Sequence, residues 1–401
     1  MVTTVTPYTD YRNRALLGQG FDGVVRIGYD GFYGTGVLLF GGRAVLTSAH
    51  LFNGPNAATA SVSFETSSGS QSITSSHISV LPSHDASSNN DLALAWLSSS
   101  APVAAERYNL YRSSDEIGQT MTMVGYGTPG SGNTGILTSY SDSHLRLKAD
   151  NQFDADIGTL KNSLGTVMAW TPLAGTQLVA DFDNGTSPRD ALGQLVNLPG
   201  LGLGQNEGLI APGDSGGPAF INGQIAGIAS YTASLAKGSI TPDIDTVTNS
   251  SFGEIAAWQR MSSYQQWIDE SLRAEYSNAP TKPADVQKIV AEGNSGTTYA
   301  YFLLEFLGVR NDPNQLLSVD YSSRDGTATA GKDYLAVNGK LVLYPNENQV
   351  AIPVEIIGDN IPEPDETLYL DVFNPVGGSF GAGIIKLTAM RTIMNDDGLL
   401  G

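Results

Sequence analysis

The 401-residue sequence contains no cysteine. Disulfide bonds and thiolate metal sites are therefore excluded, and the composition says nothing about the redox compartment. The sequence also has no apolar run near the roughly 18 residues that a membrane helix needs, and its first residues lack the basic start and apolar stretch of a secretory signal. These absences predict a protein without membrane insertion, and they leave the route of export open.

Positive charge is scarce, because 21 basic residues stand against 40 acidic ones and give a formal net charge of −19. This balance argues against nucleic acid or an anionic membrane as a partner and favours cations, calcium among them. Only 15% of residues are charged, whereas glycine occurs 46 times. Short strands joined by turns are therefore expected, and the length favours two domains.

Short apolar runs separated by Gly, Asn and Ser fill residues 22–270 and predict strands, with a short helix over residues 262–270. Residues 276–284 contain two prolines and no periodicity, which is typical of a linker. Further β-rich runs after the linker predict a sandwich. The sequence thus predicts a first domain over residues 16–275 and a second over residues 285–398.

A serine with the setting of a nucleophile lies in the glycine-rich segment Gly-Asp-Ser-Gly-Gly-Pro, at Ser215. A serine hydroxyl needs a histidine base, and the base needs a carboxylate that fixes its tautomer. His50 ends an apolar run with small residues, and Asp91 stands where a polar loop enters an apolar run. The other three histidines have no such setting: His77, His84 and His144.

The segments T-S-A-H, D-L-A-L and G-D-S-G-G-P, in this order, resemble the three signature segments of the trypsin/chymotrypsin family of serine proteases. The resemblance extends over roughly residues 16–272 and implies a chymotrypsin-type double β-barrel with a short C-terminal helix. It implies that His50 is the general base, Asp91 its orienting carboxylate and Ser215 the nucleophile. The backbone N–H groups of Gly213 and Ser215 are the implied oxyanion hole.

The same resemblance identifies candidate substrate-binding residues. The position six residues before the nucleophile, which sets specificity in trypsin-like members, is Leu209, and an apolar residue there favours small or apolar P1 side chains over basic ones. Glu207 lies close enough in the sequence to change this preference. Backbone pairing with the substrate is expected from three consecutive residues: Ser230, Tyr231 and Thr232.

Activation in this family depends on a new N-terminal amine that pairs with the Asp before the nucleophile, here Asp214. The nearest counterpart of the family's N-terminus is Leu16-Leu17-Gly18-Gln19, so cleavage after Arg14 or Ala15 would release the required amine and would make residues 1–15 a candidate propeptide. Otherwise Asp214 pairs with another cation, or the uncut chain is a zymogen.

Acidic residues recur in the loops of the second domain, which resembles a Calx-β module over residues 285–398. Hard oxygen ligands of this kind suit calcium. The positions that match the module imply seven ligands: Glu292, Asp333, Asp359, Glu363, Glu366, Asp396 and Asp397. Gly358 and Asn395 stand where the Calx-β modules of sodium–calcium exchangers have acidic residues. This difference favours one or two bound calcium ions over a full multi-ion cluster. The alternative is that these acids only solvate loops and cap turns, as Asp325 is expected to do.

Together these features predict a secreted, extracellular bacterial serine endopeptidase that acts on proteins or peptides and binds calcium through an immunoglobulin-like sandwich. No cofactor is expected for its catalytic chemistry. The alternative is a calcium-dependent adhesion or matrix-binding protein with an inactive protease fold. An esterase of the α/β-hydrolase type is excluded, because it requires the order Ser, Asp, His.

Overall fold

The computed structural model describes residues 2–52, 59–140 and 145–398, and it divides into two compact units, residues 1–267 and 268–401. His144 lies outside the described residues. Among the residues described, no helix combines the length and the apolar character that crossing a membrane requires.

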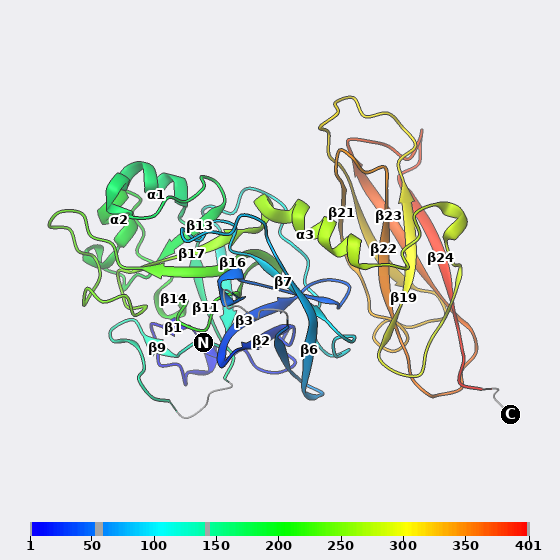
Figure 1. Ribbon diagram of the computed structural model, residues 1–401, viewed down its shortest axis with the longest axis horizontal. Helices are drawn as coiled ribbons and strands as arrows, with labels where there is room; N and C mark the ends of the chain where they lie inside the picture. Colours follow the sequence, from blue (N-terminus) through cyan, green and yellow to red (C-terminus); the bar gives the residue numbers. More distant parts are fainter. Residues whose placement is uncertain (1, 53–58, 141–144, 399–401) are drawn as a thin grey trace. The chain divides into compact units, whose positions relative to one another are not determined.

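The first half of the first unit is a closed barrel of six strands (Figure 1). In barrel order these are β2 (Val24–Tyr29), β3 (Phe32–Leu38), β4 (Ala44–Thr47), β7 (Ala93–Leu97), β6 (Gly69–Val80) and β5 (Ser61–Thr66). β5 alternates buried and less buried residues, as a strand with one face on a core does. β4 and β7 are buried throughout, so their ends deliver polar side chains from a rigid base.

The second half of the unit is a seven-stranded antiparallel sheet whose pairing ends at β11 and β12. Its order is β11 (Leu147–Gln152), β8 (Thr120–Gly125), β15 (Pro218–Ile221), β16 (Gln224–Ala233), β17 (Ile255–Arg260), β13 (Gln177–Asp181) and β12 (Ala155–Asp156). A smaller sheet has the order β10 (Gly135–Ile136), β9 (Gly130–Ser131), β1 (Thr3–Thr4) and β14 (Gly208–Leu209).

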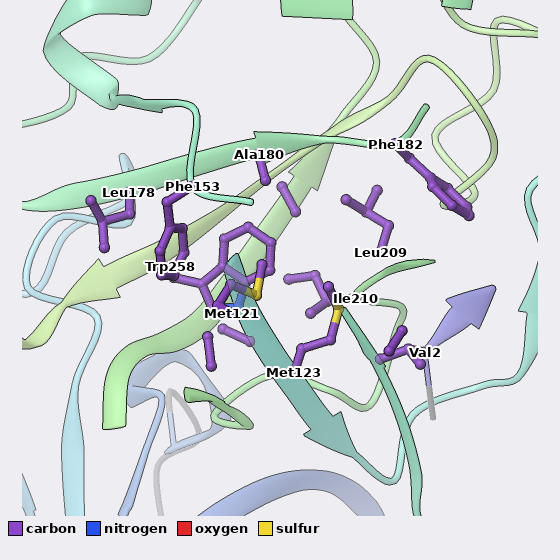
Figure 2. Close-up of a cluster of buried hydrophobic side chains, with 14 of the residues drawn as sticks. Val2, Met121, Met123, Phe153, Leu178, Ala180, Phe182, Leu209, Ile210 and Trp258 are labelled. Carbon is purple, nitrogen blue, oxygen red and sulfur yellow. The ribbon is translucent and has the colours of Figure 1, made fainter. Parts of the chain in front are cut away.

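The core of this half draws on segments far apart in the chain (Figure 2). The labelled side chains are Val2, Met121, Met123, Phe153, Leu178, Ala180, Phe182, Leu209, Ile210 and Trp258. Val2 is fully buried among them, and β1 pairs with both β9 and β14. Residues 2–15, the candidate propeptide, are therefore part of this packing rather than a separate extension.

The helices are few. α1 (Ile157–Leu164) and α2 (Ala191–Val196) lie between strands of the second half, and each begins at an aspartate whose carboxylate accepts a backbone N–H. α3 (Met261–Glu275) contains the predicted helical residues 262–270 and runs beyond them. The division between units falls within α3, and residues 276–284, the predicted linker, belong to the second unit.

The second unit is a β-sandwich. One sheet has the order β18 (Ile289–Ala291), β24 (Lys386–Met394), β23 (Glu366–Val376), β20 (Leu317–Asp325) and β21 (Asn338–Leu343), and the other pairs β19 (Thr297–Glu305) with β22 (Gln349–Ile357). Side chains from both sheets share one core. The predicted all-β class is confirmed, with a first unit that contains a closed barrel, a short helix after it and a second unit that is a sandwich.

Candidate active site

His50 and Asp91 form a hydrogen-bonded pair in the first unit. β4 ends at Thr47, and His50 follows in a short 3₁₀ turn, Ala49–Phe52. Its ring Nδ1 lies 2.7 Å from Asp91 Oδ2, and its backbone N–H donates to Asp91 Oδ1 at 2.8 Å. This two-point contact fixes the ring, and it makes Nδ1 the protonated nitrogen beside an ionised Asp91.

Asp91 is completely buried just before β7, yet it is held in its charged form. Burial opposes ionisation, but hydrogen bonds from His50 and Ser230 and the charge of His50 outweigh it and hold the pKa of Asp91 below its usual range. The Ser230 hydroxyl donates to Asp91 Oδ2, the oxygen that faces the ring. The carboxylate is therefore fully engaged.

The loop that carries Ser215 packs against the segment that carries His50. The Ser48 hydroxyl and the Gly216 N–H both donate to the carbonyl of Ala229, at 2.7 and 2.8 Å. Gly216 has φ of +83°, and a Cβ there would lie 2.8 Å from the backbone nitrogen of Ser48, so only glycine allows this approach. Ser215 is half-buried in this loop, and its own carbonyl accepts the N–H of Thr35 at 2.9 Å.

The backbone of this loop leaves two N–H groups available. The N–H groups of Asp214, Gly216 and Gly217 donate to backbone carbonyls. Within the described part of the chain, no acceptor is found for the N–H of Gly213 or Ser215. Gly213 has φ of +94°, a conformation that favours glycine. The loop can therefore direct two donors at a developing negative charge.

Asp214 is buried beneath this loop. Its carboxylate accepts the N–H groups of Gly127 and Ala211, both at 2.9 Å, and burial raises its pKa to about 6.

Leu209 and Glu207, the two residues considered for specificity, are both buried. Leu209 packs in the core drawn in Figure 2. Glu207 does not offer a free carboxylate, because its oxygens accept the N–H groups of Asp183 and Leu203, although burial raises its pKa to about 7.

The edge of β16 near the Ser215 loop is open. β16 pairs with β17 from Gly227 to Ala233, with a bulge between Ala229 and Tyr231, but its pairing with β15 ends at Ile228. Among the residues described, no strand therefore pairs with the other edge of residues 230–232. The Tyr231 hydroxyl donates to Gln177 Oε1 at 2.8 Å, so this hydroxyl is already engaged by a side chain of the same unit.

The second unit brings six of the seven candidate calcium ligands into two clusters, in each of which the ligand oxygens lie within 4.8 Å of one another. The first cluster is Glu292, Asp359 and Asp397, and the second is Asp333, Glu363 and Glu366. Burial and neighbouring carboxylates raise the pKa of Glu292 to about 7, and the same causes raise the pKa of Glu366 to about 7.

The two clusters differ in their neighbours. Lys332 lies at the second, with its Nζ 2.6 Å from Glu363 and 3.3 Å from Asp333. In the first, Asp397 Oδ2 is buried with no hydrogen-bond partner. Carboxylate oxygens that converge with one left unpartnered fit a hard cation such as calcium.

Two other acids of this unit are engaged locally. Asp396 belongs to neither cluster and accepts the N–H of Gly293 at 3.1 Å. Asp325 accepts the N–H of Ala330 and the hydroxyl of Tyr334, as expected for a residue that caps a turn.

Sequence reasoning missed two neighbours of Asp91. His84 Nδ1 lies 3.9 Å from Asp91 Oδ1 and 3.2 Å from the carbonyl of Asn89, in the same loop. His84 lies only seven residues before Asp91 in the sequence, and this short spacing could have indicated that the two side chains are neighbours. Ser230 was expected to bind substrate through its backbone, and no sequence signal indicates that its hydroxyl reaches Asp91, 139 residues away.

Comparisons with known proteins match both units. The Trypsin family matches residues 19–160, which include His50 and Asp91, and the Calx-beta family matches residues 305–397. The chain contains a Trypsin domain and a Calx-beta domain. The structure of mouse neuropsin, a serine protease expressed in the limbic system of the brain, aligns with a TM-score of 0.47 at 17% identity, over 65% of this chain and 98% of that chain.

Curated relatives include sodium/calcium exchangers. The sodium/calcium exchanger Calx of Drosophila melanogaster is 35% identical over 88 residues, which are 22% of this chain and 9% of the exchanger. Human sodium/calcium exchanger 2 is 27% identical over 201 residues, 43% of this chain and 20% of that protein. The chain thus covers a fifth or less of the length of these relatives.

Proposed function

We propose that the protein is a serine endopeptidase in which His50, Asp91 and Ser215 act as the catalytic triad. The observation that carries this proposal is the His50–Asp91 pair, with 2.7 Å between Nδ1 and Oδ2, held next to the loop of Ser215. A trypsin-type fold supports it.

In the proposed reaction Ser215 Oγ attacks the carbonyl carbon of the scissile peptide bond. Nε2 of His50 takes the hydroxyl proton and then delivers it to the leaving amine, which leaves an ester on Ser215. Water, deprotonated by the same nitrogen, hydrolyses the ester and frees Ser215. Asp91 remains ionised throughout and stabilises the imidazolium.

The N–H groups of Gly213 and Ser215 are the proposed oxyanion hole. Each such donor is worth about 3 kcal/mol in the transition state. The open edge of residues 230–232 is the proposed strand with which a substrate backbone pairs. Main-chain hydrogen bonds of this kind do not depend on the side chains of the substrate.

The proposed substrates are proteins or peptides with small or apolar P1 residues. Leu209 is apolar, and both oxygens of Glu207 are already engaged by backbone N–H groups. A Lys or Arg side chain would therefore meet no free partner from either residue.

Activation by cleavage after Arg14 or Ala15, with Asp214 as the partner of the new amine, is part of the proposal. Since Val2 is buried and β1 pairs with β9 and β14, such cleavage must be followed by release of this strand.

Calcium is the proposed ligand of the second unit, held by the clusters of Glu292 and Asp333, and Asp396 contributes from outside them. Calcium bound there stabilises the fold by linkage and supplies no step of the reaction. We further propose that the protein acts outside a bacterial cell.

Turnover of a fluorescently quenched protein substrate tests the enzymatic proposal. The wild-type chain and a Ser68→Ala control, altered at an exposed turn of the first unit, are expected to cleave it at equal rates. Ser215→Ala is expected to lose about 10⁴-fold or more in kcat/KM. Equal rates for Ser215→Ala and wild type would refute the assigned nucleophile, and a folded, inactive wild type with a new N-terminus near Leu16 would favour the adhesion alternative.

A further inference from the structure

Three buried aspartates meet in the first unit, remote in sequence from the Calx-beta domain. Asp181 ends β13, Asp183 follows two residues later, and Asp190 precedes the first turn of α2. One carboxylate oxygen from each lies within 4.8 Å of the other two, and all three residues are at most 4% exposed.

Two of these carboxylates are partly satisfied by backbone donors. Asp181 Oδ2 accepts the N–H of Leu192 at 2.7 Å, and Asp190 accepts the N–H groups of Gly193 and Gly200 at 2.6 and 3.2 Å. These bonds hold the two side chains in place and leave other lone pairs free to face a ligand.

Asp183 differs, because its Oδ1 is buried without any hydrogen-bond partner. A buried, unpaired carboxylate oxygen is costly and rare in native proteins, so it indicates a partner of another kind. Since the side chain is 4% exposed and belongs to the three-aspartate cluster, bulk water does not serve it.

No cationic side chain compensates this charge within the described residues, where none of the three aspartates forms an ion pair with Lys, Arg or His. Arg189, next to Asp190 in sequence, donates instead to the carbonyls of Pro242 and Asp243. Burial first, and then the neighbouring acids Asp181 and Glu207, raise the pKa of Asp183 to about 9.

We propose that Asp181, Asp183 and Asp190 bind a calcium ion in the protease unit. All three donors are hard carboxylate oxygens with no His or Cys among them, which suits calcium rather than zinc. Calcium takes roughly 6 to 8 oxygens, so water and backbone carbonyls complete its shell.

The ion fastens α2 to the end of β13. α2 has only six residues, too few to be stable by itself, and it packs Leu192 and Leu195 in a core with α1. The ion also fixes the start of the long connection from β13 to β14, which carries Leu209.

Calcium titration of the full chain by calorimetry tests the site. The parent for this test carries six isosteric changes that disable the Calx-beta clusters: E292Q, D359N, D397N, D333N, E363Q and E366Q. We expect this parent to retain one calcium site and Asp183→Asn to remove it. Asp156→Asn is the matched control, because Asp156 caps α1 as Asp190 caps α2, and Asn caps equally well.

Thermal unfolding gives a second readout. Calcium is expected to raise the melting temperature of the parent and of Asp156→Asn, and to leave that of Asp183→Asn unchanged. In chelator, Asp183→Asn is expected to be at least as stable as the parent, because the amide avoids the cost of burying a carboxyl group among other acids. If Asp183 had a purely structural role, Asp183→Asn would instead lower the stability in chelator.

Three results would overturn the proposal: no calcium bound by the folded parent, calcium bound equally after Asp183→Asn, or tighter binding of Mg²⁺ than of Ca²⁺. If the sixfold variant does not fold, the same comparison is made in the otherwise unaltered chain, where Asp183→Asn or Asp190→Asn must lower the calcium stoichiometry by one.

Discussion

Asp91 and Asp183 are both buried carboxyl groups, but their surroundings shift their pKa values in opposite directions. Both residues lie in the first unit, at 0% and 4% exposure. Around Asp91, His50 and Ser230 donate to the carboxylate and lower its pKa, whereas around Asp183 other acids and an unpartnered oxygen accompany a raised pKa. Burial therefore does not decide the charge of a carboxylate. The donors within reach decide it, and where they are missing a cation is the expected substitute.

The largest expected effect comes from making Asp91 neutral. In Asp91→Asn the amide donates to His50 Nδ1 and imposes the wrong tautomer, so kcat is expected to fall about 10⁴-fold while the fold is kept. Steady-state kinetics and circular dichroism check this. A loss below tenfold would mean that Asp91 does not orient the base. Asp156→Asn, the same change at a helix cap, serves as the control.

Removing one donor makes Asp91 resemble Asp183 more closely. Ser230→Ala deletes the hydroxyl that donates to Asp91 Oδ2, a bond to a charged group worth about 1.5–3 kcal/mol. We expect kcat/KM to fall at least about tenfold and the pKa of Asp91 to rise. The pH–rate profile distinguishes this from a packing defect, and Ser230→Thr should restore part of the rate. An unchanged profile would show that Ser230 is dispensable to the pair.

The two acidic clusters of the second unit differ in the same way as Asp91 and Asp183 do. Lys332 pairs with Asp333 and Glu363 in one cluster, whereas burial and other acids raise the pKa of Glu292 in the other. Lys332→Met removes a competing cation, so calcium affinity at the Asp333 cluster is expected to rise several-fold. Calorimetry with the Glu292 cluster disabled by E292Q, D359N and D397N, and with the first-unit site disabled by D183N, measures this. Weaker calcium binding in Lys332→Met would indicate that Lys332 organises the ligands instead.

The smallest effect concerns stability in acid. The pKa of Asp91 is lower in the folded chain than in the unfolded one, where it is about 3.9, so its contribution is present above that value and is lost as pH falls through the folded pKa. Urea unfolding at stepped pH should show the stability advantage of wild type over Asp91→Asn, about 1 kcal/mol, shrinking below about pH 4. A difference independent of pH would exclude this linkage.

Local pattern was sufficient to predict the fold class, the helix at residues 262–270 and the candidate catalytic positions, because each lies in a short segment with its own signature. The acids Glu292, Asp359 and Asp397 were found in the same way, through loop motifs. The contacts that the sequence did not predict arise only in the folded chain. The bond of Ser230 to Asp91 depends on how the barrel beside Asp91 packs against the sheet that carries Ser230, and the meeting of Asp181 with Asp190 depends on how the chain turns from β13 into α2. No pattern in the intervening sequence signals either contact.

The burial of Val2 and Thr3 was also beyond sequence reasoning, which treated residues 1–15 as removable. Residues 2–6 are all β-branched and suit a strand, but only the pairing of β1 with β9 and β14 gives this segment a place in the core. A two-residue strand is too brief to predict from periodicity.

The central claim, that His50 and Asp91 activate Ser215, is tested most directly by labelling with a fluorophosphonate, followed by peptide mapping and sequencing of the N-terminus. We expect one adduct on Ser215 in the wild-type chain, none in Ser215→Ala and much slower labelling in Asp91→Asn. An adduct on another serine, or equal labelling rates in wild type and Asp91→Asn, would contradict it.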